Sequence, residues 1–286
     1  MENVYFSWFR EDEQFPFFIQ YGGHEEDTNF HTHADFSELV IVLNGHATHI
    51  VRNEESFIKK GNVFVINGDT PHAYRDPHEF QICNIMYKPD MLKSAGSDLR
   101  TMNGYQALFI LEPYYRQISS YNSKLNMTIP SLEYVSSLLT SMIKEYEDEL
   151  QGYQTMLASR FMELIVYLSR QYDHPDQGVN NGLMHLASAI SYMEDRYLEQ
   201  ITLEDIANQS KISVRHLNRI FRAYYKTTPM AYLQRLRLER ACTLLKQSNL
   251  SITEISYECG YNDSNYLTRQ FKKMYGMSPK SYRNQA

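Results

Sequence analysis

The residues with the clearest chemical potential are three histidines and a glutamate in the first quarter of the chain. The segment H-T-H-A-D-F-S-E places His31 and His33 two residues apart and Glu38 five residues after the second histidine. A later segment, G-N-V-F-V-I-N-G-D-T-P-H, ends at His72. Imidazole nitrogens and carboxylate oxygens are ligands for Zn, Fe, Mn or Ni, and they also form hydrogen bonds with hydroxylated molecules. These residue types therefore suit either a metal or a small polar ligand.

A second informative set of residues lies in two related segments near the end of the chain. Residues 202–222 read T-L-E-D-I-A-N-Q-S-K-I-S-V-R-H-L-N-R-I-F-R, and residues 251–271 read S-I-T-E-I-S-Y-E-C-G-Y-N-D-S-N-Y-L-T-R-Q-F. Each pattern predicts a short helix, a tight turn and a second helix with an apolar inner face and an outer face of Arg, Asn and Gln. Two such helix-turn-helix units, one turn of DNA apart, would enter successive segments of the major groove.

The histidines lie in a region whose pattern predicts β-structure. Candidate strands cover residues 36–43, 46–51, 63–66 and 80–87. Turn signals separate them at Asn44-Gly45, Arg52-Asn53, Lys60-Gly61-Asn62 and Asn67-Gly68-Asp69. Short strands at this spacing indicate a barrel or a jelly roll. We interpret His24, His46 and His49 as surface or strand histidines.

The two histidine segments resemble the two motifs of the cupin barrels, with Ile66 as a departure where the second motif usually has Pro. In metal-binding cupins the corresponding residues converge on one ion, and here they would be His31, His33, Glu38 and His72. The sequence leaves three roles open for them: a divalent metal site, contacts to a small-molecule effector, or hydrogen bonds to one another. A divalent metal in the barrel is the one cofactor that these residues suggest. Aromatic and polar residues are expected around an effector pocket, and the candidate effector-binding residues are His31, His33, Glu38, His72, Tyr74 and Asn84.

The middle of the chain predicts two helices. Pro130 suits the first turn of a helix, apolar residues recur at helical spacing from Leu132 to Tyr146, and Gly152 ends the pattern. A second helix follows, apolar on more than one face. The apolar faces of both helices could simply pack on the barrel, and part of them must, but a second copy of the chain is a natural partner for the rest, so we expect homodimerisation through this region. The sequence of residues 105–121 does not distinguish a helix from a loop. The stretch D-H-P-D-Q-G-V-N-N-G, residues 173–182, predicts a linker.

Charge divides the chain at the same linker. The net charge is −6, but residues 183–286 carry 15 Lys and Arg against 9 Asp and Glu, whereas the first 182 residues carry 13 against 25. A basic domain on an acidic body is expected when only one domain meets DNA phosphates. The three cysteines are interpreted as reduced thiols, and we find no signal-peptide pattern and no apolar run long enough to span a membrane, which predicts a cytoplasmic protein.

These patterns predict an α+β multidomain protein. A cupin-like sensing β-barrel covers residues 1–100, a helical dimerisation region 101–172, the linker 173–182, and an all-α domain with two helix-turn-helix units 183–286. Within that last domain, Thr202 with Asp205 predicts a capping box, Ser213 caps the next helix, and Pro229 opens a long helix that joins the two units.

The last hundred residues resemble the AraC/XylS family of bacterial transcription regulators. The resemblance is carried by Pro229, Ala241, Leu244, Leu245, Ile255, Gly260, Tyr261, Phe271, Lys272, Gly276, Ser278 and Pro279. The cupin-like front half matches the sugar-responsive branch of that family. Within the branch, H-x-H-x-D-F with E-L-V-I-V, N-I-M-Y-K-P-D and C-G-Y-N-D-S-N-Y look like the L-rhamnose operon activators.

The resemblance implies which side chains face DNA. Arg215 and Arg219, and then Asp263 and Asn265, match positions that contact bases, and Arg with guanine and Asn with adenine are the favoured bidentate pairs. Asp263 has an alternative role as a helix cap. Secondary candidates are His216, Asn218, Arg222, Thr268, Arg269 and Gln270, and candidates for phosphate contacts are Lys226, Lys272 and Lys273.

We therefore expect a sequence-specific transcription regulator of the activator type, and not an enzyme. Its expected partners are double-stranded promoter DNA, RNA polymerase, a sugar-like effector and a second copy of the chain. Two alternatives stay open: a metal-dependent cupin enzyme fused to a DNA-binding module, and a regulator controlled by a protein partner without a small ligand.

Overall fold

The computed structural model describes residues 2–10, 15–52, 54–68, 70–93, 97–113, 124–173 and 181–284. The chain divides into two compact units, Met1–Ala187 and Ser188–Ala286. Most of the linker expected at residues 173–182 lies outside the described residues. Helix α7 (Asn181–Arg196) crosses the division between the units.

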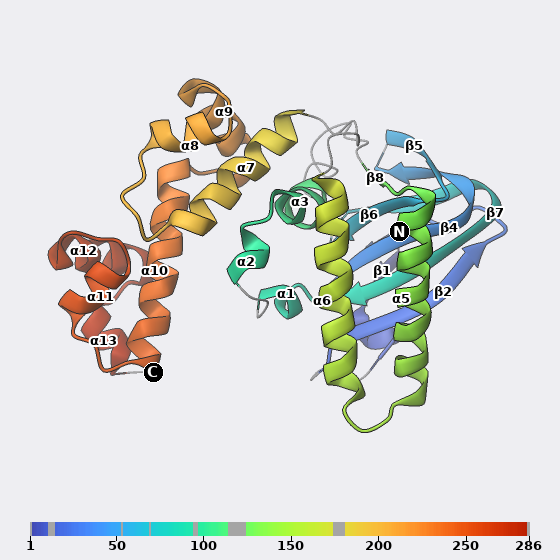
Figure 1. Ribbon diagram of the computed structural model, residues 1–286, viewed down its shortest axis with the longest axis horizontal. Coiled ribbons are helices and arrows are strands. Elements are labelled where there is room, and N and C mark those ends of the chain that lie inside the picture. The colour runs from blue at the N-terminus through green and yellow to red at the C-terminus, as the bar shows by residue number, and fades with distance from the viewer. Residues whose placement is uncertain are drawn as a thin grey trace. The chain divides into compact units, whose positions relative to one another are not determined.

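The first unit is built on one sheet of eight strands (Figure 1). The hydrogen-bonded order is β1-β3-β7-β4-β6-β8, with β2 added to β7 and β5 added to β4. The strands are β1 (Glu2–Val4), β2 (Phe17–His24), β3 (His31–His33), β4 (Ser37–Val51), β5 (Glu54–Lys59), β6 (Asn62–Asn67), β7 (His72–Tyr87) and β8 (Leu125–Asn126). Strand β8 comes from the region expected to be helical and pairs with Asn62 and Val63 of β6.

Strands β4 and β7 are long, and they pair with each other over most of their length. The turn predicted at Asn44-Gly45 is wrong, because β4 continues through it. The register shifts there instead, between Val42 and Thr48, and Gly45 adopts a φ of +66° that an L side chain rarely tolerates. Such bulges disrupt the ladder locally, and pairing with β7 resumes beyond them with the following side chains turned to the other face.

The inner face of the sheet encloses a core, as expected for a barrel. Its buried members come from four strands: Val40, Val42, Ala47, Ile58, Phe64, Ile66, Tyr74, Phe80 and Ile82. Residues 38, 40 and 42 of β4 face this core before the bulge, and residue 47 faces it after the bulge. The alternation of β4 therefore changes phase within the strand.

The opposite face of the sheet is covered by a pair of helices (Figure 1). These are α5 (Ile129–Asp148) and α6 (Tyr153–Tyr172), whose starts confirm the predicted roles of Pro130 and Gly152. Phe161 of α6 contacts the rings of Phe17 and Tyr87 on the sheet, with centroids 5.2 and 5.1 Å apart. Shorter pieces complete the unit: η1 (Phe6–Trp8), α1 (Asp90–Lys93), α2 (Ser97–Arg100), α3 (Asn103–Tyr105) and the π-helical η2 (Gln106–Leu111).

The second unit is entirely helical in its described residues. After α7 come α8 (Leu203–Gln209), α9 (Val214–Tyr225), α10 (Pro229–Gln247), α11 (Ile252–Glu258), α12 (Ser264–Tyr275) and α13 (Pro279–Arg283). The capping box of Thr202 and Asp205, the cap at Ser213 and the start of α10 at Pro229 confirm the predictions from the sequence. A second capping box, formed by Ser251 and Glu254, begins α11. No helix among the described residues is long and apolar enough to cross a membrane.

Candidate ligand site and nucleic-acid interface

The three histidines and the glutamate come together at one end of the core in the first unit. Strand β3 pairs with β7 through His31 and His72, so their rings lie 4.2 Å apart, centroid to centroid. Glu38 reaches the same place from β4. Its Oε2 lies 3.7 Å from His33 Nε2 and 3.8 Å from His72 Nε2. The predicted quartet is thus one cluster.

Burial decides the charges in this cluster. Glu38 is 4% exposed, and burial raises the pKa of its carboxyl to about 8. Burial lowers the pKa of His33 to about 3, and it also lowers the pKa of His72 well below the usual value. Burial thus favours the uncharged form of all three side chains and weakens the ion pairing of Glu38 with the two imidazoles.

The residues of the cluster fit a transition metal. The ligand nitrogens of His31, His33 and His72 all lie within 4.8 Å of one another. Ligand atoms about 2.0–2.2 Å from one ion lie somewhat closer together than that, so binding would draw the three rings inward by a small movement. His33 Nδ1 and His72 Nε2 are buried without a hydrogen-bond partner among the described residues. A bound ion would favour the ionised form of Glu38 as a fourth ligand.

The core beside the cluster is lined with aromatic rings and polar groups. Tyr74 is 3% exposed, and the buried Oδ1 atom of Asn84 has no hydrogen-bond partner among the described residues. Tyr74 belongs to the inner core, and Asn84 pairs with Val40 of that core. The surface interpretation of His49 is wrong: this strand histidine is fully buried and stacks on Phe64 and Tyr74, with centroids 4.8 and 5.1 Å away.

Sequence reasoning missed His49 because of the bulge in β4. Simple alternation from Val40 and Val42 places residue 49 on the outside, whereas the phase change places it inside beside Ala47. His24 is half-buried and also stacks on Tyr74, with centroids 5.3 Å apart. A row of rings therefore runs from the His31–His72 pair into the core.

In the first helix-turn-helix unit, α9 buries one face and exposes the other. Leu217, Ile220 and Phe221 are buried, whereas Arg215, Arg219 and Arg222 are exposed. An Arg219 Nη2 atom lies 3.4 Å from His216 Nε2. The Asn218 amide donates to the carbonyl oxygen of Val214, so this side chain is engaged with its own helix.

In the second helix-turn-helix unit, α12 likewise buries one face and exposes the other. Leu267 and Phe271 are buried, and Asn265, Arg269, Lys272 and Lys273 are exposed. Asp263 caps the helix, because its Oδ1 accepts the backbone N–H of Asn265 at 2.9 Å. The Thr268 hydroxyl donates to the carbonyl oxygen of Ser264, and Gln270 is half-buried.

The exposed side chains occupy matching positions in the two units. Arg215 and Arg219 stand two and six residues after the N-cap Ser213. Asn265 and Arg269 stand two and six residues after the N-cap Asp263. Residues four apart lie on one face of a helix, so each helix-turn-helix unit presents a pair of polar side chains at matching positions.

Two contacts fasten the second helix-turn-helix to the rest of its unit. Arg237 of α10 donates to the backbone between α7 and α8 and lies over the ring of Tyr261, 5.6 Å from its centroid. The Gln200 amide donates to the carbonyl oxygen of Gly260 at 2.8 Å. These contacts hold α11 and α12 to the α7–α8 connection, and hence to the first helix-turn-helix.

Comparison with known proteins covers both units. Residues 16–165 match the AraC-like ligand binding domain, and residues 206–285 match a helix-turn-helix domain. The chain is 29% identical over 255 residues to the HTH-type transcriptional activator RhaS of Enterobacter sp. (strain 638), covering 88% of this chain and 86% of that protein. It is 26% identical over 272 residues to the HTH-type transcriptional activator RhaR of Mannheimia succiniciproducens, covering 95% and 93%.

Among solved structures, an AraC-type transcriptional regulator from Chromobacterium violaceum is 34% identical. The match covers 35% of this chain and 90% of that chain, with a TM-score of 0.34.

Proposed function

The chain belongs to the family of AraC-type regulators, and from this premise we propose that it activates transcription when a sugar binds in its β-domain. The observation that carries the proposal is the pair of exposed, matching polar faces on α9 and α12, each presented by a helix-turn-helix unit. A regulator that reads DNA needs these faces, and an enzyme does not.

On DNA, base contacts and phosphate contacts come from different side chains in this proposal. Arg215, Arg219 and Asn265 contact base edges, where Arg pairs with guanine and Asn with adenine. Asp263 already caps α12 through Oδ1, so its base contact uses the second carboxylate oxygen. Secondary contacts come from His216, Asn218, Arg222, Thr268, Arg269 and Gln270, and phosphate contacts come from Lys226, Lys272 and Lys273.

The effector occupies the end of the core where the histidine cluster lies. Hydrogen bonds from His31, His33, Glu38, His72, Tyr74 and Asn84 suit the hydroxyl groups of a sugar, and the neighbouring rings suit its apolar faces. A ligand shifts the regulator only if it binds the active arrangement with a more favourable free energy than the inactive one. We also propose that two copies of the chain associate through α5 and α6 and that the regulator contacts RNA polymerase. Its proposed location is the cytoplasm.

Two measurements on the full chain test this function. Selection from a random DNA pool, followed by footprinting, should recover one sequence contacted at two sites about one helical turn apart. A melting-temperature screen with neutral sugars should find a ligand whose effect grows with the logarithm of its concentration. If the selection recovers no preferred sequence, the proposed function as a sequence-specific regulator is contradicted. A preferred sequence together with no sugar-induced shift would favour control by a protein partner.

The convergence of three imidazoles supports a second candidate property, a divalent metal held by His31, His33, His72 and Glu38. The ion would act as a charged centre to which hydroxyl or carboxylate oxygens of a ligand bind. Elemental analysis of the purified chain should find Zn, Fe, Mn or Ni near one equivalent, lost in His33→Ala and kept in His46→Ala. A metal-free chain that takes up none of these ions would contradict this candidate and also the enzyme alternative.

A further inference from the structure

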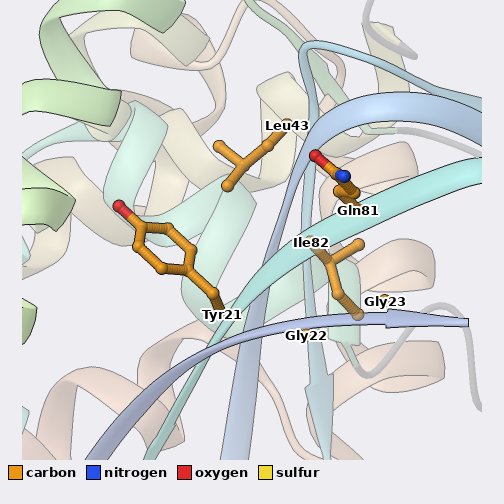
Figure 2. A pocket seen from close by; sticks show the side chains of 6 residues that line it. All are labelled: Tyr21, Gly22, Gly23, Leu43, Gln81 and Ile82. Carbon is orange, nitrogen blue, oxygen red and sulfur yellow. The ribbon is translucent and has the colours of Figure 1, made fainter.

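A pocket of about 620 Å³ lies beside strands β2, β4 and β7 (Figure 2). It is lined by Tyr21, Gly22 and Gly23 of β2, Leu43 of β4, and Gln81 and Ile82 of β7. Tyr21 lies on the face that carries α5, because its hydroxyl oxygen is 3.1 Å from Thr140 Oγ1 of that helix. Tyr21 and the histidine cluster therefore lie on opposite faces of the sheet, and Ile82 of the lining belongs to the inner core between them.

Local sequence explains why the sheet is hollow here. Two consecutive glycines in β2 leave this part of the strand without side chains. Gly23 in particular has no room for one, since an added Cβ would lie 2.9 Å from the carbonyl oxygen of Phe80. Opposite them, the register passes from the Val42–Ile82 pair to the Asn44–Gln81 pair, so Leu43 sits unpaired in a bulge. Bulges and strand glycines mark places where a ligand or another group approaches the backbone.

The lining has the chemistry of a site for an uncharged molecule. The Tyr21 ring, in a side chain that is 49% exposed, and the Leu43 side chain project from the strands on either side of β7 toward the same space (Figure 2). Gln81 adds an exposed amide that both donates and accepts hydrogen bonds. None of the six lining residues carries a charge, and the volume is within the range of small-molecule sites.

We propose that this outer pocket binds a neutral sugar through the Tyr21 ring and the Gln81 amide, independently of the histidine cluster. The apolar face of the sugar ring packs on Tyr21, and its hydroxyl groups pair with the amide. Tyr21 also bridges to the helix pair, because its hydroxyl oxygen lies 3.1 Å from Thr140 Oγ1 on α5. A sugar that engages this hydroxyl changes the contact between the sheet and α5. The proposal shares only its ligand class with the proposed function.

The test is calorimetric titration of the full chain with a panel of neutral monosaccharides and disaccharides. Gln81→Ala removes the amide, Tyr21→Ala removes the ring, and Leu43→Trp fills the space. Phe57→Ala is the matched control, since Phe57 is an exposed ring in the same unit that lies on β5, outside the pocket. We expect at least tenfold weaker binding in each pocket variant, with the affinity of Phe57→Ala unchanged.

Variants on the two faces of the sheet separate the two hypotheses. Glu38→Gln alters the inner cluster and should leave the outer site intact. If Gln81→Ala and Leu43→Trp bind every sugar as the parent chain does, or if no sugar binds, the outer site is overturned. Binding lost only in Glu38→Gln would also overturn it while supporting the inner effector site. Sedimentation that shows a dimer broken by Leu43→Trp would assign the pocket to a second copy of the chain instead.

Discussion

Arg237, in the middle of α10, donates a hydrogen bond from Nε to the carbonyl oxygen of Tyr197, beyond the end of α7, at 2.6 Å. The Nη2 atom of the same guanidinium donates to the backbone carbonyl oxygen of Glu199, also at 2.6 Å. Arg237 is 9% exposed, and both hydrogen bonds are partly buried. One side chain thereby connects the long helix to the segment that precedes the first helix-turn-helix.

Replacement of Arg237 should therefore destabilise the second unit. Arg237→Met keeps much of the side-chain volume but removes the donor to the Tyr197 carbonyl oxygen, at about 1–3 kcal/mol, whereas the Glu199 carbonyl oxygen keeps the backbone N–H of Ile201 as a donor. Urea unfolding of the full chain, followed by circular dichroism, should show an earlier transition. Arg240→Met changes an exposed arginine of the same helix and should shift the transition by less than about 0.5 kcal/mol. Equal effects of the two variants would contradict this role for Arg237.

Gly260 offers a second test of how the helices are joined. Its φ of +73° disfavours any L side chain, and an added Cβ would lie 2.6 Å from the carbonyl oxygen of Leu198. Gly276 has nearly the same φ, +74°, but an added Cβ there would meet nothing within 4 Å. Gly276→Ala should therefore cost only the conformational term, about 1–2 kcal/mol.

Gly260→Ala should cost more than Gly276→Ala, because it adds the clash with the α7–α8 connection to the same conformational term. The difference between the two variants in urea unfolding measures the clash alone. A difference near zero would mean that the connection moves freely away from Gly260, and the joint between the two helix-turn-helix units would then be loose.

Local rules predicted the helical unit well and the sheet less well. The cap at Thr202 with Asp205 and the start at Pro229 depend on residues within one turn of each other, so the sequence suffices. The break predicted at Asn44-Gly45 failed because pairing with β7, a partner distant in the sequence, keeps β4 extended through a bulge. That phase change places His49 inside the core. The sequence near His49 does not predict the phase change, because it depends on pairing with β7.

The candidate sites follow the same division. The His-x-His pair and Glu38 were recognisable from spacing, and the structure brings them together with His72. The outer pocket was not predictable, because it requires the register of β2 against β7 together with the bulge at Leu43. The exposed faces of α9 and α12 were predictable, since helical periodicity alone separates Leu217 from Arg215 and Arg219.

The capping box at the start of α8 should respond to acid. Hydrogen bonds from the Thr202 hydroxyl and backbone N–H lower the pKa of Asp205 below its usual 3.8. Folding thus favours the ionised carboxylate, which stabilises the helix start above the usual aspartate pKa. This stabilisation is lost as the pH falls through the lowered value.

Hydrogen exchange resolves this effect within the full chain. Protection factors of peptides from residues 203–209 should fall on acidification below about pH 4, the region of the aspartate pKa. Asp205→Asn should show the lower protection at every pH and little further change. Glu204→Gln removes an equal charge at the neighbouring residue and should keep the acid response. If Asp205→Asn responds to acid as the parent chain does, another group controls the helix start.

Arg219 and Arg269 stand at the same position of their helices. Measurements of DNA affinity should show whether these side chains contact bases or only phosphates. With the selected operator, Arg219→Ala should cost about 1–3 kcal/mol and relax the preference at one base pair, because a bidentate contact with a guanine is lost. Lys280→Ala removes an exposed charge from α13 and serves as the control.

The readout is affinity for the operator and for each single-base variant of it, measured at fixed salt and compared with random DNA. A side chain that contacts only phosphates weakens all sequences alike and lowers the salt dependence. Arg219→Ala should instead lose affinity for the operator and little for random DNA. Equal losses on both would remove Arg219 from the base-contacting set. If Arg269→Ala relaxes the sequence preference at a base pair about one helical turn away, the matching positions act alike in the two helix-turn-helix units.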